Sequence, residues 1–228
     1  MTKSIETDIL IIGAGPVGLF TVFEAGLLGL KCHLVDNLDK IGGQCIELYP
    51  EKPIYDIPGV PNQTGKEHID SLLKQIEPFD YEVHLNQRVD KIEQSGDYWI
   101  AETTDGISFK TLNIFIAAGA GSFEPRKPPV ESPDKFLGKG IDYAVRSVDK
   151  YKDKDIVIFG GGDSALDWSV ELANKAKSIK LVHRRDDFRG AEHTENKMRN
   201  FVASGEIELK IPFVIKSIVG DKSFEGVE

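Results

Sequence analysis

The stretch from Asp155 to Arg189 reads DIVIFGGGDSALDWSVELANKAKSIKLVHRRDDFR and decides the fold. An apolar run at residues 156–159 leads into a glycine turn, and an apolar-periodic segment follows at residues 165–173. A second apolar run at residues 179–182 ends in two arginines and a histidine. This order predicts strand, tight turn, helix and strand, which together form a βαβ unit.

The glycine turn carries a dinucleotide-binding fingerprint, G-x-G-x-x-G/A, between the predicted strand and helix. One glycine makes the turn, one lets the backbone approach a pyrophosphate, and a small third residue lets helix and strand pack closely. The helix N-terminus then offers N–H groups to phosphates. The predicted cofactor-binding residues of this turn are Gly160, Gly162, Asp163, Ser164 and Ala165.

The end of the second strand indicates which nucleotide is bound. An NAD site usually has Asp or Glu there, which binds the ribose 2′-hydroxyl, but this chain has His183. Arg184, Arg185 and Arg189 follow, and guanidinium groups match a 2′-phosphate in charge and geometry. These residues therefore predict an NADP(H) site. The alternative is a glycine turn beside a solvated basic patch.

A second fingerprint lies near the N-terminus, where Gly13, Gly15, Pro16 and Gly18 follow the apolar run at residues 8–12. Asp36 stands eighteen positions after Gly18, and His183 stands eighteen positions after Ala165. The two units therefore share one construction and differ at the acid position. Asp36 suits a free 2′-hydroxyl, as in the adenosine ribose of FAD or NAD. The alternative is a solvated turn carboxylate.

Composition narrows the function further. The net charge of −9 argues against general affinity for nucleic acid or for an anionic membrane. The apolar stretch at residues 9–30 could suggest a membrane span, but the glycines and Pro16 interrupt it where a turn is expected. A buried strand and a helix buried nearly all round explain it better. Two cysteines fit a reducing cytoplasm, and no metal site is expected: Cys32 and His33 are interpreted as packing residues.

The remaining segments complete an α/β prediction. Thr64 and Glu67 predict a capping box that starts a helix. Short strands are predicted at residues 89–93, 98–103, 107–109 and 114–116, then a proline-marked linker, a helix at 192–203 and a strand at 207–219. The predicted fold is two Rossmann-like, three-layer dinucleotide-binding domains, each with a small β-meander.

Five stretches together resemble the ferredoxin–NADP reductases of the thioredoxin-reductase-like type, over essentially the whole chain. They are residues 13–18, residues 42–45 leading into Leu-Tyr-Pro-Glu-Lys at 48–52, residues 117–120, residues 160–168 and residues 183–189. The Leu-Tyr-Pro-Glu-Lys stretch is the most specific of them.

The resemblance implies a cytoplasmic homodimer that transfers electrons between NADP(H) and ferredoxin through FAD. It implies a FAD-binding domain at residues 1–121 and an NADP(H)-binding domain at residues 122–228. It further implies FAD contacts from Asp36, Gly43, Gln44, Tyr49 (stacked on the flavin), Val89, Gly119 and Phe123. No acid, base or nucleophile is expected among the side chains, because the cofactors carry the chemistry. From the residues alone, Tyr49 could equally be a core aromatic.

Two other functions compete with this reading. A dithiol reductase of the thioredoxin-reductase kind would need two cysteines where Ala144 and Ser147 stand. The glutathione-reductase-like pattern needs two cysteines five positions apart; Cys45 fits the first position, but Pro50 occupies the second. A non-catalytic NADP(H)-binding module is the other alternative. Flavodoxin or another small carrier could also replace ferredoxin.

The chain is also expected to be a C-terminally truncated form. The family pattern returns to the FAD domain with a Gly-Asp motif and a helix over the flavin, and the sequence shows neither. The expected complete product is about 100 residues longer, within the size of two ordinary domains.

Overall fold

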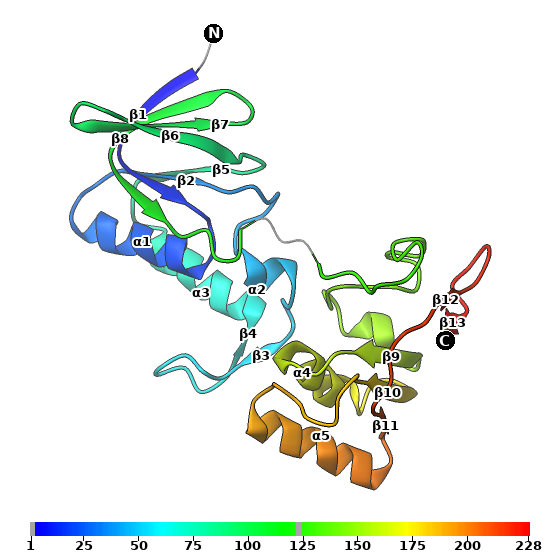
Figure 1. The fold of residues 1–228 in the computed structure, drawn as a ribbon. Helices are drawn as coiled ribbons and strands as arrows, with labels where there is room; N and C mark the ends of the chain where they lie inside the picture. The colour runs from blue at the N-terminus through cyan, green and yellow to red at the C-terminus, as the bar shows by residue number, and fades with distance from the viewer. Residues whose placement is uncertain (1–2, 122–124) are drawn as a thin grey trace. The chain divides into compact units, whose positions relative to one another are not determined.

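A computed structural model describes residues 3–121 and 125–228 (Figure 1). The chain divides into two compact units, Met1–Glu124 and Pro125–Glu228. Each unit is described by itself. None of the helices among the described residues is long and apolar enough to cross a membrane.

The first unit is built on a six-stranded mixed sheet with the order β5-β2-β1-β8-β7-β6. The four strands from β5 to β8 are parallel, and β7 and β6 continue the sheet as antiparallel neighbours. The strands are β1 Lys3–Ile12, β2 Cys32–Val35, β5 Tyr81–His84, β6 Val89–Ser95, β7 Tyr98–Thr103 and β8 Ile107–Ile116. A separate antiparallel pair joins β3 Pro53–Ile54 to β4 Gln63–Thr64.

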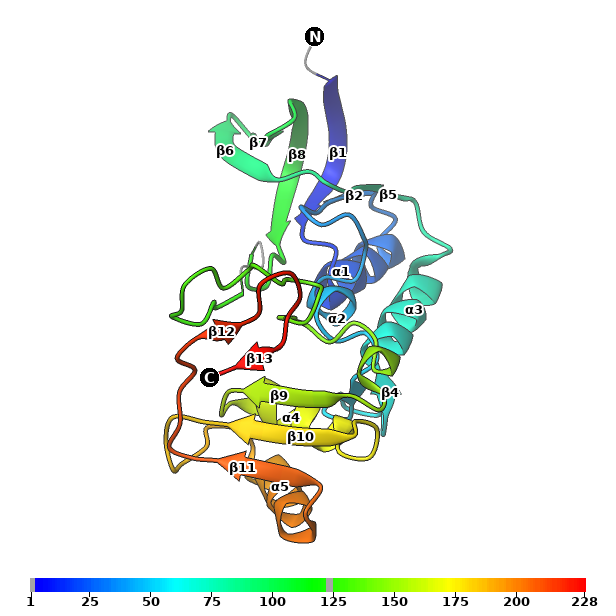
Figure 2. The same cartoon turned by 90° about the vertical axis from the view of Figure 1, so that its right-hand side faces the viewer.

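Helices cover one face of the parallel strands and the meander lies towards the other, which gives three layers (Figures 1 and 2). The helices are α1 Pro16–Leu27, α2 Gln44–Glu47 and α3 Gly65–Ile76. On β1, Ile9 and Ile11 belong to the core beneath the helices, while Leu10 packs in a smaller cluster with Ala101 and Phe109. Burial on both faces explains the unbroken apolar run of this strand.

The first unit differs from the sequence prediction in four respects. Strand β1 begins at Lys3, because it pairs with β8 in register from Lys3–Ile107 to Ile12–Ile116, and this pairing also joins two predicted strands into β8. Strand β5 was not predicted. Helix α1 is not buried all round: Val17 is 67% exposed and Leu27 61%.

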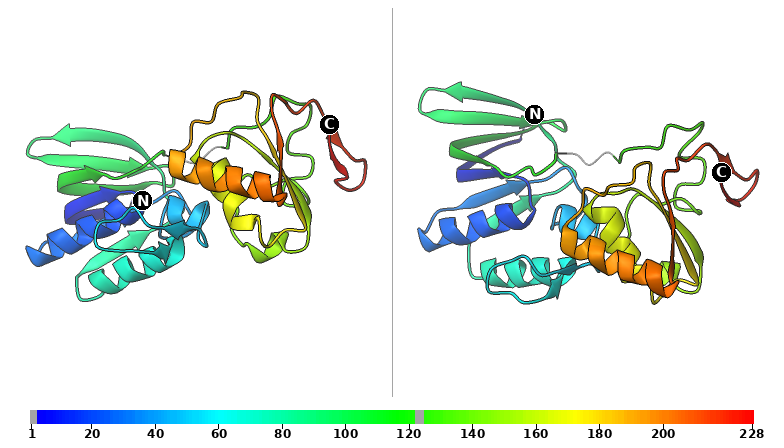
Figure 3. Two further views of the ribbon diagram at one scale, coloured as in Figure 1. Left: turned by 90° about the horizontal axis from the view of Figure 1, so that it is seen from below. Right: turned by 60° about the horizontal axis from the view of Figure 1, so that its bottom comes forward.

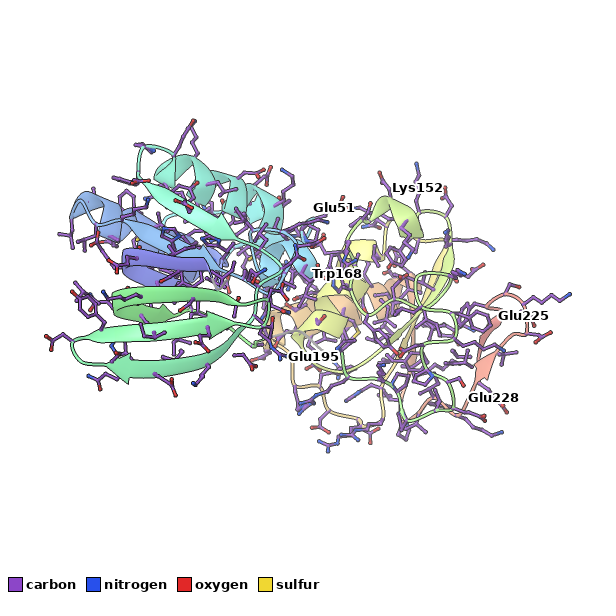
Figure 4. All side chains as sticks on the ribbon, turned by 90° about the horizontal axis from the view of Figure 1, so that it is seen from above. Glu51, Lys152, Trp168, Glu195, Glu225 and Glu228 are labelled. Carbon is purple, nitrogen blue, oxygen red and sulfur yellow. The ribbon has the colours of Figure 1, made fainter. Side chains whose placement is uncertain are left out.

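The second unit holds a three-stranded parallel sheet of order β11-β10-β9, with α4 and α5 on one face (Figures 2 and 3). The strands are β9 Asp155–Phe159, β10 Ser178–Val182 and β11 Ile207–Lys210; the helices are α4 Asp163–Leu172, α5 Glu192–Ser204 and the short 3-10 helix η1 Asp149–Tyr151. Trp168, labelled in Figure 4, lies on α4 and is buried.

The strand predicted at residues 207–219 is wrong in its length. Strand β11 ends at Lys210, and a separate antiparallel pair joins β12 Ile218–Val219 to β13 Gly226–Val227. Pro212 has no N–H with which to continue a ladder. The next residue, Phe213, instead donates its N–H to the carbonyl of His183 at 3.0 Å, so the chain turns back to the end of β10.

Candidate functional site

The fingerprint turn of the first unit is held so tightly that two of its glycines admit no side chain. Gly13 has φ +111°, and a Cβ there would lie 2.3 Å from the carbonyl oxygen of Ala117 at the end of β8. A Cβ on Gly18 would lie 1.9 Å from the carbonyl oxygen of Gly13. The first turn of α1 therefore packs directly against the backbone of the turn that precedes it.

A second loop meets this turn backbone to backbone. Gly43 has φ +55°, and a Cβ on it would lie 3.0 Å from the Cα of Gly15. Gly15 is the N-cap of α1, its helix has no side-chain cap, and Pro16 occupies the first turn. By contrast, Thr64 and Glu67 close a complete capping box on α3, as predicted. The start of α1 thus keeps N–H groups and a backbone cradle of the kind that binds phosphate.

Asp36 directly follows β2 and is hydrogen-bonded to this turn. Its Oδ2 accepts the N–H of Ala14 at 2.7 Å, and its Oδ1 accepts the N–H of Leu38 at 2.9 Å. The N–H of Asp36 donates to the carbonyl of His84 on β5 at 3.0 Å. The carboxylate is therefore fixed beside the glycine turn, where it can still accept further hydrogen bonds with its remaining lone pairs.

Two of the residues predicted to contact the flavin, Gln44 on α2 and Gly119 after β8, lie beside each other. The Nε2 of Gln44 lies 3.6 Å from where a Cβ of Gly119 would stand, so these two residues are neighbours. The N–H of Gln87 donates to the carbonyl of Asp36 at 2.9 Å, which brings the start of β6, at Val89, near the acid. Phe123 lies outside the described residues.

Tyr49 lies against the core of the first unit, with its hydroxyl 3.8 Å from the sulfur of Cys45. Burial, followed by the nearby Cys45, raises the pKa of Tyr49 to about 12. Both cysteines are buried and free. Burial raises the pKa of Cys45, and burial together with the charge of Asp8 raises the pKa of Cys32 to about 11, so both thiols stay protonated near neutral pH.

The fingerprint turn of the second unit has the same construction as that of the first unit, but one of its glycines has more free space around it. Gly160 has φ +151°, and a Cβ there would lie 2.8 Å from the Cβ of Ala165, while a Cβ on Gly162 would meet nothing within 4 Å. Gly162 is the N-cap of α4, again without a side-chain cap. Asp163 and Ser164 are exposed in the first turn, and the Oδ1 of Asp163 accepts the N–H of Ala191 at 2.8 Å.

His183, which replaces the acid, covers this turn with its ring. A Cβ on Gly161 would lie 2.3 Å from the His183 Cε1. The ring stacks on Phe188 with centroids 5.2 Å apart, and its Nε2 lies 3.2 Å from the carbonyl oxygen of Asp187. The guanidinium of Arg199 lies 5.6 Å from the Phe188 ring. The imidazole is therefore a packed platform, and it is 9% exposed.

The arginines that follow His183 in the same loop are exposed to solvent. Arg184, Arg185 and Arg189 are all exposed, and the loop that bears them folds back on the turn because the Arg189 N–H donates to the Gly161 carbonyl at 2.7 Å. Exposed guanidinium groups beside an uncapped helix start can bind a phosphate group.

Sequence reasoning missed two contributors to these sites. Phe188 stacks on His183, and the only signal for it was an aromatic residue five positions later in the same loop. The carbonyl of His84 holds the backbone of Asp36, and it could not be found without predicting β5. The other predicted turn residues come together as expected, although their contacts with cofactors stay predictions.

Two βαβ units, each with an uncapped helix start at a glycine turn, define a protein built to bind two nucleotides. In accord with this, the family described as pyridine nucleotide-disulphide oxidoreductase matches residues 7–228. The ferredoxin–NADP reductase of Bradyrhizobium sp. (strain BTAi1 / ATCC BAA-1182) is 56% identical over 212 residues, and that of Nitrobacter hamburgensis is 52% identical over 229. The thioredoxin reductase of Lactococcus lactis has a similar structure, with a TM-score of 0.81 at 26% identity, covering 97% of this chain and 69% of that one.

The chain therefore belongs to the pyridine nucleotide-disulphide oxidoreductase family, and within it to the thioredoxin-reductase-like type that includes these ferredoxin–NADP reductases. The predicted resemblance and fold class are confirmed. Proteins of this type bind FAD and NADP(H), the two predicted cofactors. The match covers 92% of this chain and 62% of the Bradyrhizobium relative, and 100% and 67% for the Nitrobacter relative.

Proposed function

We propose that the protein transfers electrons between NADP(H) and ferredoxin, with FAD held by residues 1–121 and NADP(H) held by residues 122–228. One observation carries the proposal: the equivalent strand ends of two similar units carry opposite charge. The first ends in a carboxylate at Asp36, and the second ends in His183 with three exposed arginines around it. Two different nucleotides fit these ends better than two copies of one.

The first unit suits the adenosine and pyrophosphate parts of FAD. Gly15 and Gly43 leave a cradle that a Cβ would narrow, and the start of α1 supplies N–H groups for the pyrophosphate. Asp36 would accept a hydrogen bond from the ribose. The residues proposed to hold FAD are Gly13, Gly15, Pro16, Gly18, Asp36, Gly43, Gln44, Tyr49, Val89, Gly119 and Phe123. Bound FAD would supply the redox chemistry, so these residues bind and orient.

The second unit suits NADP(H). Gly162 and the start of α4 leave open backbone for a pyrophosphate, and nothing lies within 4 Å of a Cβ at Gly162. Arg184, Arg185 and Arg189 would bind the 2′-phosphate, each with the charge and fork geometry that phosphate favours. The residues proposed to hold NADP(H) are Gly160, Gly162, Asp163, Ser164, Ala165, His183, Arg184, Arg185 and Arg189.

The choice of ferredoxin over a dithiol substrate is supported by the cysteines. A dithiol reductase needs a reactive thiolate with a partner sulfur, whereas both thiols here are buried and have raised pKa values. Two relatives at 52–56% identity carry the name ferredoxin–NADP reductase. We propose ferredoxin as the partner on these two grounds.

We further propose that the protein is a cytoplasmic homodimer. The resemblance to the thioredoxin-reductase-like reductases supports the dimer. The two cysteines, Cys32 and Cys45, are both free, which is compatible with a reducing compartment. Gel filtration with light scattering tests the oligomeric state.

The direct test is reduction of purified ferredoxin by NADPH, using a protein that spans the full length of the curated relatives, with FAD supplied and cytochrome c as the reporter. The expected result is FAD-dependent turnover with NADPH, much slower turnover with NADH, and no reduction of thioredoxin. Ferricyanide reduction in parallel separates cofactor chemistry from partner recognition. Reduction of a disulfide substrate in place of ferredoxin would contradict the proposal, and so would tight NADPH binding without any turnover.

A further inference from the structure

Three side chains that the nucleotide sites do not use meet at the edge of the first unit's sheet. His33 lies on β2, and Glu82 and His84 lie on the edge strand β5. The parallel register sets His33 opposite Glu82 and Val35 opposite His84, so all three side chains project from one face. One ligand atom from each lies within 4.8 Å of the others.

The two imidazoles direct nitrogen atoms at each other. The Nδ1 of His33 lies 2.9 Å from the Nε2 of His84, and the ring planes differ by 13°. The ring centres are 5.2 Å apart, close to the nitrogen separation plus the radius of each ring, so the two nitrogens lie near the line that joins the centres. The in-plane lone pairs therefore face each other between the rings, where a proton fits at the present separation and a cation would fit once the rings move apart.

The surroundings combine an apolar wall with a solvent-facing carboxylate. The ring of Phe109 lies 5.1 Å from that of His84 and 5.9 Å from that of His33, measured between centroids. His33 is 2% exposed, whereas Glu82 is exposed and places its Oε1 3.9 Å from the Nε2 of His33. This Nε2 is the ring nitrogen of His33 that does not face His84, so the exposed Glu82 side chain would have to turn to bring a carboxylate oxygen to an ion held between the two rings.

We propose that His33, Glu82 and His84 form a binding site for a divalent transition cation of zinc-like chemistry. Two imidazoles and a carboxylate are a donor set that suits zinc, and harder cations such as magnesium prefer oxygen ligands alone. Nitrogens bound to one tetrahedral ion at about 2.0–2.1 Å lie roughly 3.4 Å apart, so the rings need to separate by about half an ångström and also to turn, so that their lone pairs meet at the ion instead of pointing along one line. His84 is half-buried and lies on the edge strand of the sheet.

The bound cation would have a structural role. It would join β5 to β2 at the position where the His84 carbonyl accepts the Asp36 N–H. The ion would therefore brace the strand pair that positions the proposed ribose-binding acid. This role departs from the sequence interpretation of His33 as a packing residue, which did not include β5.

Calorimetric titration with zinc chloride tests the site, using protein without an affinity tag and previously freed of metal by a chelator. The expected result is saturable binding of about one ion per chain, and no comparable binding of magnesium. Glu82→Gln should weaken zinc binding by at least about tenfold. Asp80→Asn is the matched control, because it removes a neighbouring exposed carboxylate that also faces Lys31 but lies outside the cluster.

Two further variants and a thermal-stability measurement separate a loss of zinc binding from a loss of folding. His84→Gln should abolish saturable binding, and His193→Gln on α5 should leave it unchanged. Zinc should raise the thermal midpoint of the wild type more than that of Glu82→Gln, whose exposed side chain is compatible with normal folding. Equal zinc affinity in the wild type, Glu82→Gln and His84→Gln would overturn the proposal, as would a lack of saturable binding: the two histidines would then form a hydrogen-bonded pair only.

Discussion

The first and second βαβ units share one plan and differ in how closely their parts approach. In the first, a Cβ on Gly18 would lie only 1.9 Å from the carbonyl oxygen of Gly13, and Gly43 approaches Gly15 backbone to backbone. In the second, the corresponding third position is already Ala165, and Gly162 has open space around it. The first site is thus enclosed by a second loop of its own unit, while the second is open at the equivalent glycine.

The strand ends differ in chemistry as well as in space. Asp36 uses its carboxylate to hold its own turn, through Ala14 and Leu38. His183 instead covers Gly161 with a ring stacked on Phe188, and the charge is supplied by arginines that remain exposed. A fixed acid suits the hydroxyl of a cofactor that stays bound, and an exposed set of guanidinium groups suits the phosphate of a nucleotide that binds and dissociates.

The largest effect is expected when Arg184 and Arg185 are both replaced by alanine. Each charge-assisted contact with a phosphate contributes roughly 1.5–3 kcal/mol. The double replacement should therefore remove about 3–6 kcal/mol of transition-state stabilisation, seen as a lower kcat/KM for NADPH, with much less change for NADH. Steady-state kinetics with both nucleotides measures it. Arg88→Ala, an exposed arginine of the first unit, is the control. Equal losses for both nucleotides would show that these arginines do not bind the 2′-phosphate.

Gly18→Ala should come next, because its Cβ would meet backbone that cannot move aside. The expected cost is about 3 kcal/mol in the free energy of unfolding of the first unit. The reciprocal change, Ala165→Gly, should cost only about 0.5–1 kcal/mol, through the lower helix propensity of glycine. Denaturant unfolding measures both. If the two costs were equal, the proposed difference in tightness between the turns would be wrong.

Asp36→Asn should weaken FAD binding by about 2 kcal/mol. Each carboxylate oxygen of Asp36 now accepts a hydrogen bond from a backbone N–H, and in the variant the amide NH₂ would face one of these N–H groups, donor against donor. NADPH binding should be unchanged. Flavin fluorescence during titration measures the FAD affinity, and Asp39→Asn, an exposed neighbour, is the control. A similar loss of NADPH affinity would argue against separate sites.

The smallest effect is expected from Cys45→Ser, which should leave ferricyanide and ferredoxin reduction nearly unchanged. Both cysteines should also react slowly in the folded chain. The raised pKa of about 11 for Cys32, against an ordinary 9.0, lowers its thiolate fraction near pH 8 by about a hundredfold. Alkylation by iodoacetamide with and without denaturant tests this. Loss of ferredoxin reduction with the flavin still bound would require a sulfur intermediate.

Local sequence patterns were enough to find both βαβ units. Each combines an apolar run, a glycine turn with small residues at fixed positions, and a helix start, and all of these depend on neighbours in the chain. The spacing from Gly18 to Asp36 and from Ala165 to His183 also fixed which residues end the second strands. The capping box of Thr64 and Glu67 is local in the same way.

Features set by distant partners were not predicted. Strand β5 carries exposed Glu82 between half-buried neighbours, and its place beside β2 is set by pairing with residues about fifty positions earlier. The full length of β8 follows from its pairing with β1. The exposed apolar face of α1 was misjudged because the apolar character of a helix does not show what covers it. The His33–His84 contact depends on β5 and was missed with it.

The central claim is that the second unit recognises a 2′-phosphate, and calorimetric titration with adenosine 2′,5′-bisphosphate and with 5′-AMP tests it most directly. These ligands differ by that phosphate alone, and the measurement needs neither flavin nor ferredoxin. The wild type should bind the bisphosphate at least about a hundredfold more tightly, which is the contribution of roughly two charge-assisted contacts, and the Arg184/Arg185 double alanine variant should lose most of that preference. Equal affinity of the wild type for the two ligands would contradict the account.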